Sequence, residues 1–337
     1  MKNQKQGIAI AGSLISDVFY QIDTYPDQGL LVNVRNTTHH VGGSGNIILD
    51  LAKLDSDLPV KVYAIVGADN NGKHLLSTLS KYKNIDQAGI TVEGESSITM
   101  VMNASDTKQR TFFFIPGASD VFDESYVNWD NINAKIFHLE YLLLMKKVDS
   151  FDPEYGTHGA KMLCKAKQRG MLTSIDIVSE QSDRAKTVIK SALKYTDICC
   201  INEFEAQSVT EINLVNENGE LLPSAVKQAI QKICSLGVSK WIVIHSPKES
   251  FGYDVEKDEF VCLKSFNLPK DYIKGTTGAG DAYCGGILYG AYCDYSITQA
   301  MEIARATATC SLSENNGSDG LRPISDALAF VKRFKEL

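Results

Sequence analysis

The sequence predicts an α/β fold with a mainly parallel central sheet, helices on both of its faces and a small extra β-sheet. Three observations carry this prediction. Short apolar segments alternate with amphipathic segments of helical length, which is typical of βαβ units. The apolar segments are nearly continuous, as in strands that are buried on both faces. Two other segments alternate polar and apolar residues, which indicates strands outside that sheet.

The elements follow from the spacing of apolar residues along the chain. Strands of the parallel sheet are expected at the apolar runs 7–12, 60–67, 134–142, 172–178, 198–202 and 240–246. Apolar residues recur at helical spacing in 45–54, 72–82, 156–170, 183–195 and 223–237. An amphipathic helix is expected to close the chain at 325–337.

The two alternating segments, 18–37 and 97–115, each have a turn near the middle and predict antiparallel hairpins. A small β element of this kind would cover the crevice where α/β sheets bind their ligands. We therefore expect one domain over residues 1–337, with lid segments at about 18–37 and 95–116 inserted in it.

Composition limits the classes of partner. The net charge of −7 provides no basic footprint for nucleic acid. No stretch has the apolar length of a signal peptide or a membrane span. The eight cysteines show no CxxC or zinc-type spacing, so we expect reduced thiols in a cytoplasmic protein. Neither a nucleic acid nor a membrane is expected as a partner.

The segment GTTGAGD (275–281) places small residues and one acid at the start of a predicted helix. Unpaired amides at a helix start attract anions, and small residues let a phosphate approach the backbone. Asp281 would then act as a base on a hydroxyl that attacks the phosphate. A glycine-rich turn with an acid near the helix start explains the residues of this segment equally well.

A second glycine group, GGSGN (42–46), precedes another predicted helix. Glycine lets a ligand touch the backbone, and the Asn46 amide both donates and accepts hydrogen bonds, which suits sugar hydroxyls. A tight turn with a capping Asn46 is the alternative. A dinucleotide site is excluded, because its glycine pattern would have to follow the first strand directly.

A third group, NEFE (202–205), follows an apolar strand. Carboxylate and amide oxygens suit Mg²⁺, which often keeps water ligands and reaches the protein through one or two acidic groups. Alternatively, Asn202 caps a helix and the glutamates stabilise its first turn.

The order of AGSLISD (11–17), GGSGN, VGADNNG (66–72), NEFE and GTTGAGD resembles the ribokinase-like, or PfkB, family of carbohydrate kinases over nearly the whole chain. The resemblance implies a ribokinase-like three-layer α/β fold with a β-sheet lid. It also implies phosphorylation of an alcohol group on a sugar-like substrate with ATP and Mg²⁺.

The resemblance also implies roles for individual residues. Asp281 is similar to the catalytic base, and the amides of Gly278, Ala279 and Gly280 are similar to the anion hole for the transferred phosphoryl group. The positions that hold substrate hydroxyls in such kinases correspond to Asp17, Gly42, Gly43 and Asn46, and an acid that holds sugar in ribokinase corresponds to Glu140. The contacts to ATP correspond to Asn202, Glu205, Thr277, Gly278 and Gly280, of which Asn202 and Glu205 would hold Mg²⁺ through water.

The chain departs from the family at two places. Gly275 stands where the family usually has Asp, which helps to hold an activating monovalent cation in ribokinase, so cation dependence is open. The glycines expected near 245–251 are replaced by Pro247 and Ser250, which puts the usual contacts to the nucleotide in doubt.

The expected activity is therefore an ATP-dependent sugar kinase. A nucleoside kinase of the same fold stays open because of the aromatic residues on the lid segments, and so does a sensor that has lost catalysis. Arg35 and Arg110, also on the lid segments, are expected to be solvated, with contact to a substrate phosphate as the alternative for either. A homodimer is expected to form through exposed lid strand edges.

Overall fold

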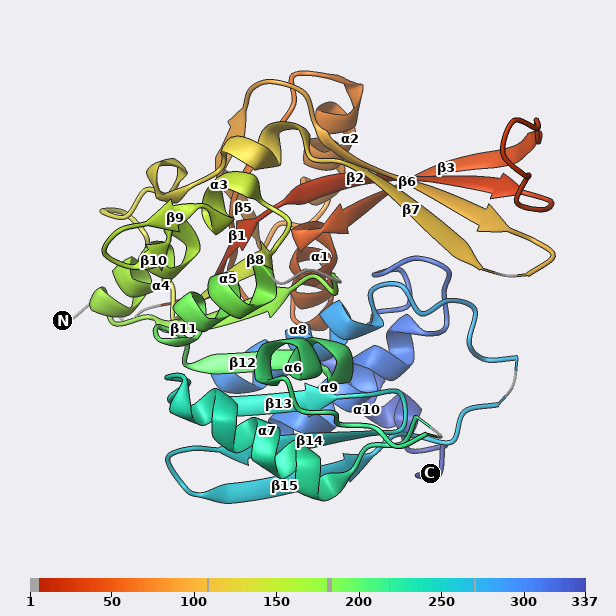
Figure 1. Ribbon diagram of the computed structural model, residues 1–337. Coiled ribbons are helices and arrows are strands. Elements are labelled where there is room, and N and C mark those ends of the chain that lie inside the picture. The colour runs from red at the N-terminus through yellow and green to blue at the C-terminus, as the bar shows by residue number, and fades with distance from the viewer. Residues whose placement is uncertain (1–5, 108, 181–183, 218, 270) are drawn as a thin grey trace.

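The computed structural model describes residues 6–107, 109–180, 184–217, 219–269 and 271–337. A nine-stranded sheet in the order β15-β14-β13-β12-β11-β8-β1-β4-β5 runs through the body of the molecule (Figure 1). All six predicted strands occur in it and pair in parallel, as β1 (Ile8–Gly12), β4 (Val60–Val66), β8 (Ile136–Leu142), β11 (Leu172–Ile177), β12 (Ile198–Asn202) and β13 (Trp241–His245). The predicted fold class is confirmed.

Three outer strands of this sheet, two of them at its edges, are not among the predicted ones. β5 (Ile85–Val92) lies beside β4, while β14 (Glu249–Asp254) and β15 (Glu259–Lys264) extend the other edge in antiparallel order. Most residues of β5 and β15 are at least partly exposed. Edge strands of this kind lack the continuous apolar run by which the central strands are found.

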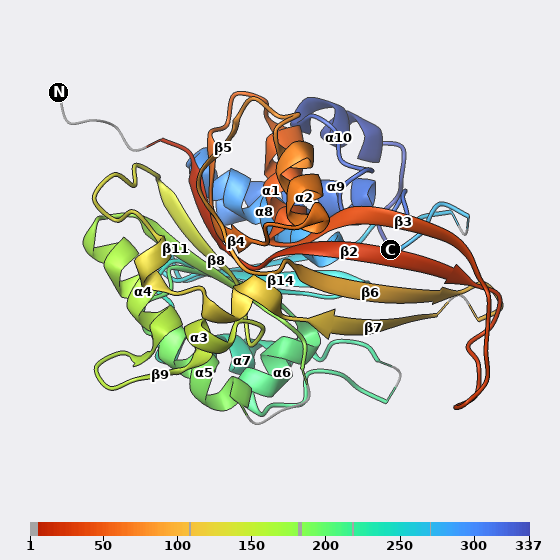
Figure 2. The ribbon, with the colours of Figure 1, turned by 90° about the horizontal axis from the view of Figure 1, so that it is seen from above.

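The helices form one layer on each face of the sheet, as Figure 2 shows from above. One layer contains α1 (Ser44–Leu54), α2 (Asn70–Leu79), α8 (Ala279–Tyr292), α9 (Ile297–Ser311) and α10 (Ile324–Val331). The other contains α4 (His158–Gln168), α5 (Arg184–Leu193), α6 (Glu203–Thr210) and α7 (Pro223–Ser235). Short elements complete the chain: α3 (Lys146–Asp149), β9 (Phe151–Asp152), β10 (Gly156–Thr157) and the 3₁₀ turns at Gly117–Val121 and Glu124–Tyr126.

Alternate residues of the central strands fill the two cores. Ile8 and Ile10 pack in the core beneath α1 and α8, whereas Ala9 and Ala11 pack in the other. Side chains of successive strand residues point to opposite faces, so a strand between two helical layers is apolar throughout. This explains why the unbroken apolar runs identified the central strands.

Two predicted helices need comment. Asp183, the first residue of the helix expected at 183–195, lies outside the described residues. The helix expected at 325–337 ends at Val331. Beyond it, Asn267 donates to Lys335 O (2.7 Å) and Leu337 to Ser265 O (2.9 Å). The last residues therefore satisfy their backbone groups by pairing with an extended segment.

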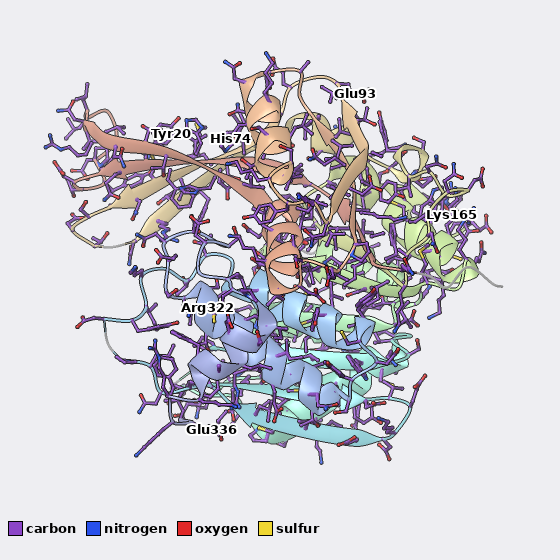
Figure 3. All side chains as sticks on the ribbon, turned by 180° about the vertical axis from the view of Figure 1, so that it is seen from behind. Tyr20, His74, Glu93, Lys165, Arg322 and Glu336 are labelled. Atoms are coloured by element: carbon purple, nitrogen blue, oxygen red, sulfur yellow. The ribbon has the colours of Figure 1, made fainter. Side chains whose placement is uncertain are left out.

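A four-stranded sheet projects from the body (Figure 1). It has the order β3-β2-β6-β7 and contains β2 (Leu14–Ile22), β3 (Val34–Gly43), β6 (Ser97–Ala104) and β7 (Arg110–Ile115). The two predicted hairpins are present as antiparallel pairs, and β2 and β6 join them in parallel. Figure 3 labels Tyr20 on this small sheet and His74 on α2 beside it.

The order of the parallel strands reverses at β1. The chain runs from β1 outward to β4 and β5, then returns to β8 on the other side of β1 and continues to β11, β12 and β13. Ligands of open α/β sheets bind at the carboxyl ends of the strands beside such a reversal. Gly12 and Glu140, which pair at those ends, mark the position of the site.

All eight cysteines are unpaired. Within the described ranges, no helix combines the length and the apolar character that crossing a membrane requires.

Candidate active site

The first turn of α8 lies next to α1, under the small sheet (Figures 1 and 2). Gly278 begins the helix in the left-handed region, with φ +77°, and no described side chain caps the helix. A Cβ at Gly278 would lie 2.2 Å from Gly317 Cα. Only glycine fits this position, because both the backbone angle and the contact exclude a side chain. The uncapped first turn leaves its amides and the positive end of the helix dipole to a ligand.

Among these amides, that of Ala279 already donates to Thr276 O, at 3.3 Å. Ala282 begins the regular helical bonding by donating to Gly278 O at 2.8 Å. Gly280 and Asp281 lie between them in the first turn, where a helix provides no acceptor for its own amides.

Asp281 is buried, with 7% of its surface exposed, and both of its carboxylate oxygens accept hydrogen bonds. Asn46 Nδ2 donates to Oδ2 at 2.8 Å, and the Tyr141 hydroxyl donates to Oδ1. Burial raises the pKa of Asp281, and these two donors lower it. The carboxylate is therefore fixed at the helix start by residues from α1 and from the end of β8.

The glycine group before Asn46 lies in regular structure rather than in a loop. Gly42 and Gly43 end strand β3, and Gly45 lies inside α1. A Cβ at Gly42 would lie 2.1 Å from Asp17 Oδ2, so glycine here makes room for the Asp17 carboxylate. Gly43, with φ +58°, turns the chain from β3 into α1. The turn delivers Asn46 to Asp281.

Several acids surround Asp281. Carboxylate oxygens of Glu140, Asp176 and Asp281 all lie within 4.8 Å of one another. Glu140 is fully buried, and neither of its oxygens has a hydrogen-bond partner among the described residues. Burial, together with the charges of Asp281 and Asp176, raises the pKa of Glu140 well above its usual range. This crowding favours the protonated form of the acids around the base.

Two further acids belong to this group. Burial and the charge of Asp281 raise the pKa of Asp50. This acid is fully buried on α1, and no side chain or backbone group in the described part of the chain bonds to its carboxylate. Burial also raises the pKa of Asp17 to about 7, opposed by a hydrogen bond from Thr99. His138, 3.4 Å from Glu140, adds no positive charge at neutral pH, because burial lowers its pKa to about 3.

Asn202 and Glu205 form a capping box at the start of α6. Asn202 Oδ1 accepts from Glu205 N at 2.9 Å, and Glu205 Oε2 accepts from Asn202 N at 2.8 Å. Burial raises the pKa of Glu205 to about 7. Glu205 Oε1 already accepts from Ser179 and from Asn202 Nδ2, whereas Asn202 Oδ1 and Glu205 Oε2 accept one bond each. The last two oxygens each keep a lone pair, which fits Mg²⁺ held through water.

Arg110 differs from the prediction that it is solvated. It is partly buried, and its guanidinium donates to Thr277 Oγ1 and, at 3.3 Å, to Asn315 O. A Cβ at Gly275 would lie 3.0 Å from Arg110 Nη2. Glycine at 275 thus leaves room for the Arg110 guanidinium, which comes from the small sheet and lies beside the loop that precedes α8. Arg35, by contrast, is exposed and pairs with Asp23.

The altered segment near 245–251 forms a tight connection between β13 and β14. Ser246 N donates to Glu249 O at 2.9 Å. His245 stacks on Tyr283, with ring centroids 5.0 Å apart, and its Cε1 lies 3.6 Å from where a Cβ of Gly280 would be. An imidazole therefore lies beside the first turn of α8.

The structure brings Asp17, Gly42, Asn46, Glu140 and Asp281 together, and it places Thr277, Gly278 and Gly280 next to them. Sequence reasoning missed Tyr141, Asp176, His245 and the contact of Arg110. Tyr141 follows Glu140 directly, and Asp176 and His245 lie at or next to the ends of β11 and β13. Polar residues at the ends of parallel strands were the signal that would have found them.

Comparisons with known proteins show the family of this chain. A family model described as "pfkB family carbohydrate kinase" matches residues 6–323. The bifunctional protein HldE of Aliarcobacter butzleri is 23% identical over 353 residues, which cover 100% of this chain and 69% of that protein. The ribokinase of Haemophilus influenzae is 21% identical, covering 97% of this chain and 99% of that protein.

Among solved structures, Arabidopsis thaliana ribokinase complexed with ribose and ATP superimposes with a TM-score of 0.79 at 18% identity, covering 98% of this chain and 99% of that one. This likeness supports the fold, and the family match extends over nearly all of the chain. The chain therefore belongs to the pfkB family of carbohydrate kinases and is an ATP-dependent kinase that phosphorylates a sugar hydroxyl.

Proposed function

We propose that this kinase transfers the γ-phosphoryl group of ATP to a hydroxyl of a sugar or sugar-like substrate, with Asp281 as the base. One observation carries the proposal. The Asp281 carboxylate is held by Asn46 and Tyr141 in the first turn of an uncapped helix, where the strand order reverses. Anion site and base therefore lie within one helical turn.

In the proposed step, Asp281 accepts the proton of the substrate hydroxyl while the hydroxyl oxygen forms a bond to the γ-phosphorus. The bond between that phosphorus and the β,γ-bridging oxygen breaks, and ADP leaves. The amides of Gly278, Ala279 and Gly280 would stabilise the charge on the transferred group. Of these, Gly280 is the best placed, because Ala279 already donates to Thr276.

The substrate would lie between the small sheet and Asp281. Asp17, Gly42, Gly43 and Asn46 meet there, and their carboxylate, backbone and amide groups suit hydroxyls. Glu140 is the weakest member of the proposed set, since its side chain is fully buried.

ATP would lie on the other side of the base. The proposed phosphate contacts are Thr277, Gly278 and Gly280, and Asn202 and Glu205 would hold Mg²⁺ through water. When bound, Mg²⁺ offsets negative charge on the phosphates. The Arg110 guanidinium lies beside Gly275. Gly275 supplies no carboxylate for a monovalent cation, so we infer activity without added K⁺.

The small sheet would serve as a lid on the single domain 1–337, with the inserted segments at about 18–37 and 95–116, and would exclude water during transfer. Exposed apolar residues gather on this sheet, among them Val34, Phe113 and Ile115. They support a homodimer through the lid, and a monomer in analytical ultracentrifugation at micromolar concentration would contradict it. A cytoplasmic location without nucleic-acid or membrane partners stays part of the proposal.

A nucleoside is the second candidate substrate. The Phe19 ring lies 5.7 Å from the Arg110 guanidinium, so an aromatic side chain of the small sheet is on the site face. A base stacked on it would give tight binding of nucleosides but not of free sugars. A sensor without catalysis is disfavoured, because mere binding does not require a buried carboxylate held by two donors.

The test is ADP release with D-ribose, D-fructose, other sugars and adenosine as acceptors. Asp281→Asn should lower kcat by several orders of magnitude and leave ATP affinity nearly unchanged. Asp326→Asn is the matched control, because Asp326 also lies in the first turn of a helix, α10, but is exposed. Wild-type turnover by the Asp281→Asn variant would refute the assignment of the base. ATP and sugar binding without turnover of any acceptor would favour the sensor.

A further inference from the structure

Tyr141 is the residue in the site whose function neither the motifs nor the family match assigns. It follows Glu140 near the end of β8, and its hydroxyl donates to Asp281 Oδ1. Asn46 donates to the other oxygen at 2.8 Å. A carboxylate oxygen has two lone pairs, so both contacts leave Asp281 able to accept a proton from a substrate.

The charges around Asp281 make these donors important. Acidic side chains face it from five elements: Asp17 on β2, Asp50 on α1, Glu140 on β8, Asp176 on β11 and Glu205 on α6. Burial and each ionised neighbour favour the protonated, unreactive form of Asp281. His138 is uncharged at neutral pH, and His245, beside Gly280, also has a lowered pKa, of about 4, because it is buried.

We propose that Tyr141 is a positioning residue that keeps the Asp281 carboxylate ionised and oriented for proton transfer. This rests on the proposed function of Asp281 as the base. A hydroxyl that donates to a carboxylate stabilises its charged form and opposes the surrounding acids. Asn46 does the same from α1, so one donor fixes each oxygen.

Tyrosine suits this role because it remains a donor at every pH at which the kinase would work. Burial and the charge of Asp281 raise the pKa of Tyr141 well above its usual value. An acid or a histidine at this position would titrate and would lose its proton to the base or compete for that of the substrate. The phenol contributes a hydrogen bond without entering the proton transfer.

The experiment removes only the hydroxyl, by Tyr141→Phe, which keeps the ring and its packing. Protein labelled with ¹³C at the aspartate carboxyl carbon is titrated by NMR, and the Asp281 signal is identified by its absence from Asp281→Asn. The titration midpoint should rise by about one to two pH units, the equivalent of one lost hydrogen bond to a charged group. This readout requires no substrate.

Tyr126→Phe is the matched control, because Tyr126 donates to Glu93 Oε1 at 2.6 Å, outside the site. It should leave the Asp281 midpoint unchanged. A Tyr141→Phe midpoint within about 0.3 pH units of wild type, a small fraction of the expected shift, would overturn the proposal.

Kinetics distinguish this proposal from the function on which it rests. With the acceptor found by ADP release, Tyr141→Phe should raise the apparent pKa of the acid limb of the kcat/KM profile by the same number of pH units. The KM for ATP should be unchanged. If Asp281→Asn is inactive but Tyr141→Phe has the wild-type profile, only the role of Tyr141 fails. If Asp281→Asn is active, the proposed base fails as well.

Discussion

Helices α6 and α8 both begin beside the proposed site, and their first turns are built in opposite ways. At α6, Asn202 and Glu205 satisfy each other's backbone amides in a capping box. At α8, Gly278 begins the helix without any side-chain cap among the described residues, and the acid of its first turn bonds to Asn46 and Tyr141 instead. Glu205 and Asp281 are close enough for the charge of Asp281 to raise the pKa of Glu205.

The difference indicates where a ligand is expected. A capping box uses the first-turn amides for the stability of its own helix. An uncapped turn leaves them to water or to an anion. The acid in such a turn is then free to act on the ligand. We therefore place chemistry at α8 and a supporting role at α6.

Among the substitutions that test this difference between α6 and α8, the largest effect is expected from Gly278→Ala, which would destroy the open turn. Alanine disfavours φ +77°, and its Cβ would meet Gly317. The free energy of unfolding should fall by about 2–4 kcal/mol, and kcat/KM should fall at least about a hundredfold if the turn binds the phosphoryl group. Gly219→Ala isolates the backbone cost, because Gly219 has φ +71° with open space around it. Equal loss of activity in Gly278→Ala and Gly219→Ala would contradict the proposal that the first turn of α8 binds the phosphoryl group.

The next largest effect is expected from the Arg110 guanidinium, which lies beside the open turn. Arg110→Met removes the guanidinium that contacts Thr277 and Asn315. We expect kcat/KM for ATP to fall about tenfold to a hundredfold, as for one charge-assisted contact. Arg35→Met, on the same small sheet but paired with Asp23, should behave as wild type. Steady-state kinetics with varied ATP would show whether the two variants differ.

Glu205→Gln separates capping from metal binding at α6. Glutamine still completes a capping box, as Gln299 does with Ser296 on α9. Unfolding free energy should therefore change by less than about 0.5 kcal/mol, while the Mg²⁺ concentration for half-maximal activity should rise several-fold. The control Gln299→Glu should change neither the free energy of unfolding nor the Mg²⁺ concentration for half-maximal activity. An unaltered Mg²⁺ requirement in Glu205→Gln would mean that the box serves α6 alone.

The smallest effect concerns the acids packed behind α8. Burial raises the pKa of Asp50 well above 3.8, so the folded protein keeps this proton to a higher pH than the unfolded chain does. Above about pH 4, unfolding therefore releases this proton. The stability that protonated Asp50 contributes is fully present at low pH. It is lost as the pH rises from about 4 to the pKa of Asp50 in the folded state. Asp50→Asn cannot titrate and should remove this slope. In thermal unfolding between pH 5 and 8, the unfolding temperature of Asp50→Asn should rise relative to that of wild type as the pH increases. Asp57→Asn, at an exposed position nearby, should run parallel to wild type.

Much of this arrangement could be predicted without a structure. Continuous apolar runs located every central strand, and the order of glycine and acid motifs indicated the fold and a phosphoryl-transfer site. The sequence does not predict β5 and β15, because exposed residues interrupt their apolar pattern. It does not predict β14 either, because buried and partly buried residues alternate there and most of them are not apolar. The closing helix is shorter than the sequence predicts, because the last residues of the chain pair with 265–267 instead. Spacing along the sequence does not reveal such a partner.

The sequence by itself determined the architecture and the identity of the acid at the start of α8, because both depend on local spacing and residue type. Only the tertiary structure decided what surrounds that acid. Asn46 and Tyr141 lie 235 and 140 residues from Asp281 along the chain, and Arg110 reaches Thr277 across 167. Such contacts arise from strand order and helix packing, which bring remote residues to one edge of the sheet. The pKa of a buried acid depends on those neighbours, and no local pattern specifies them.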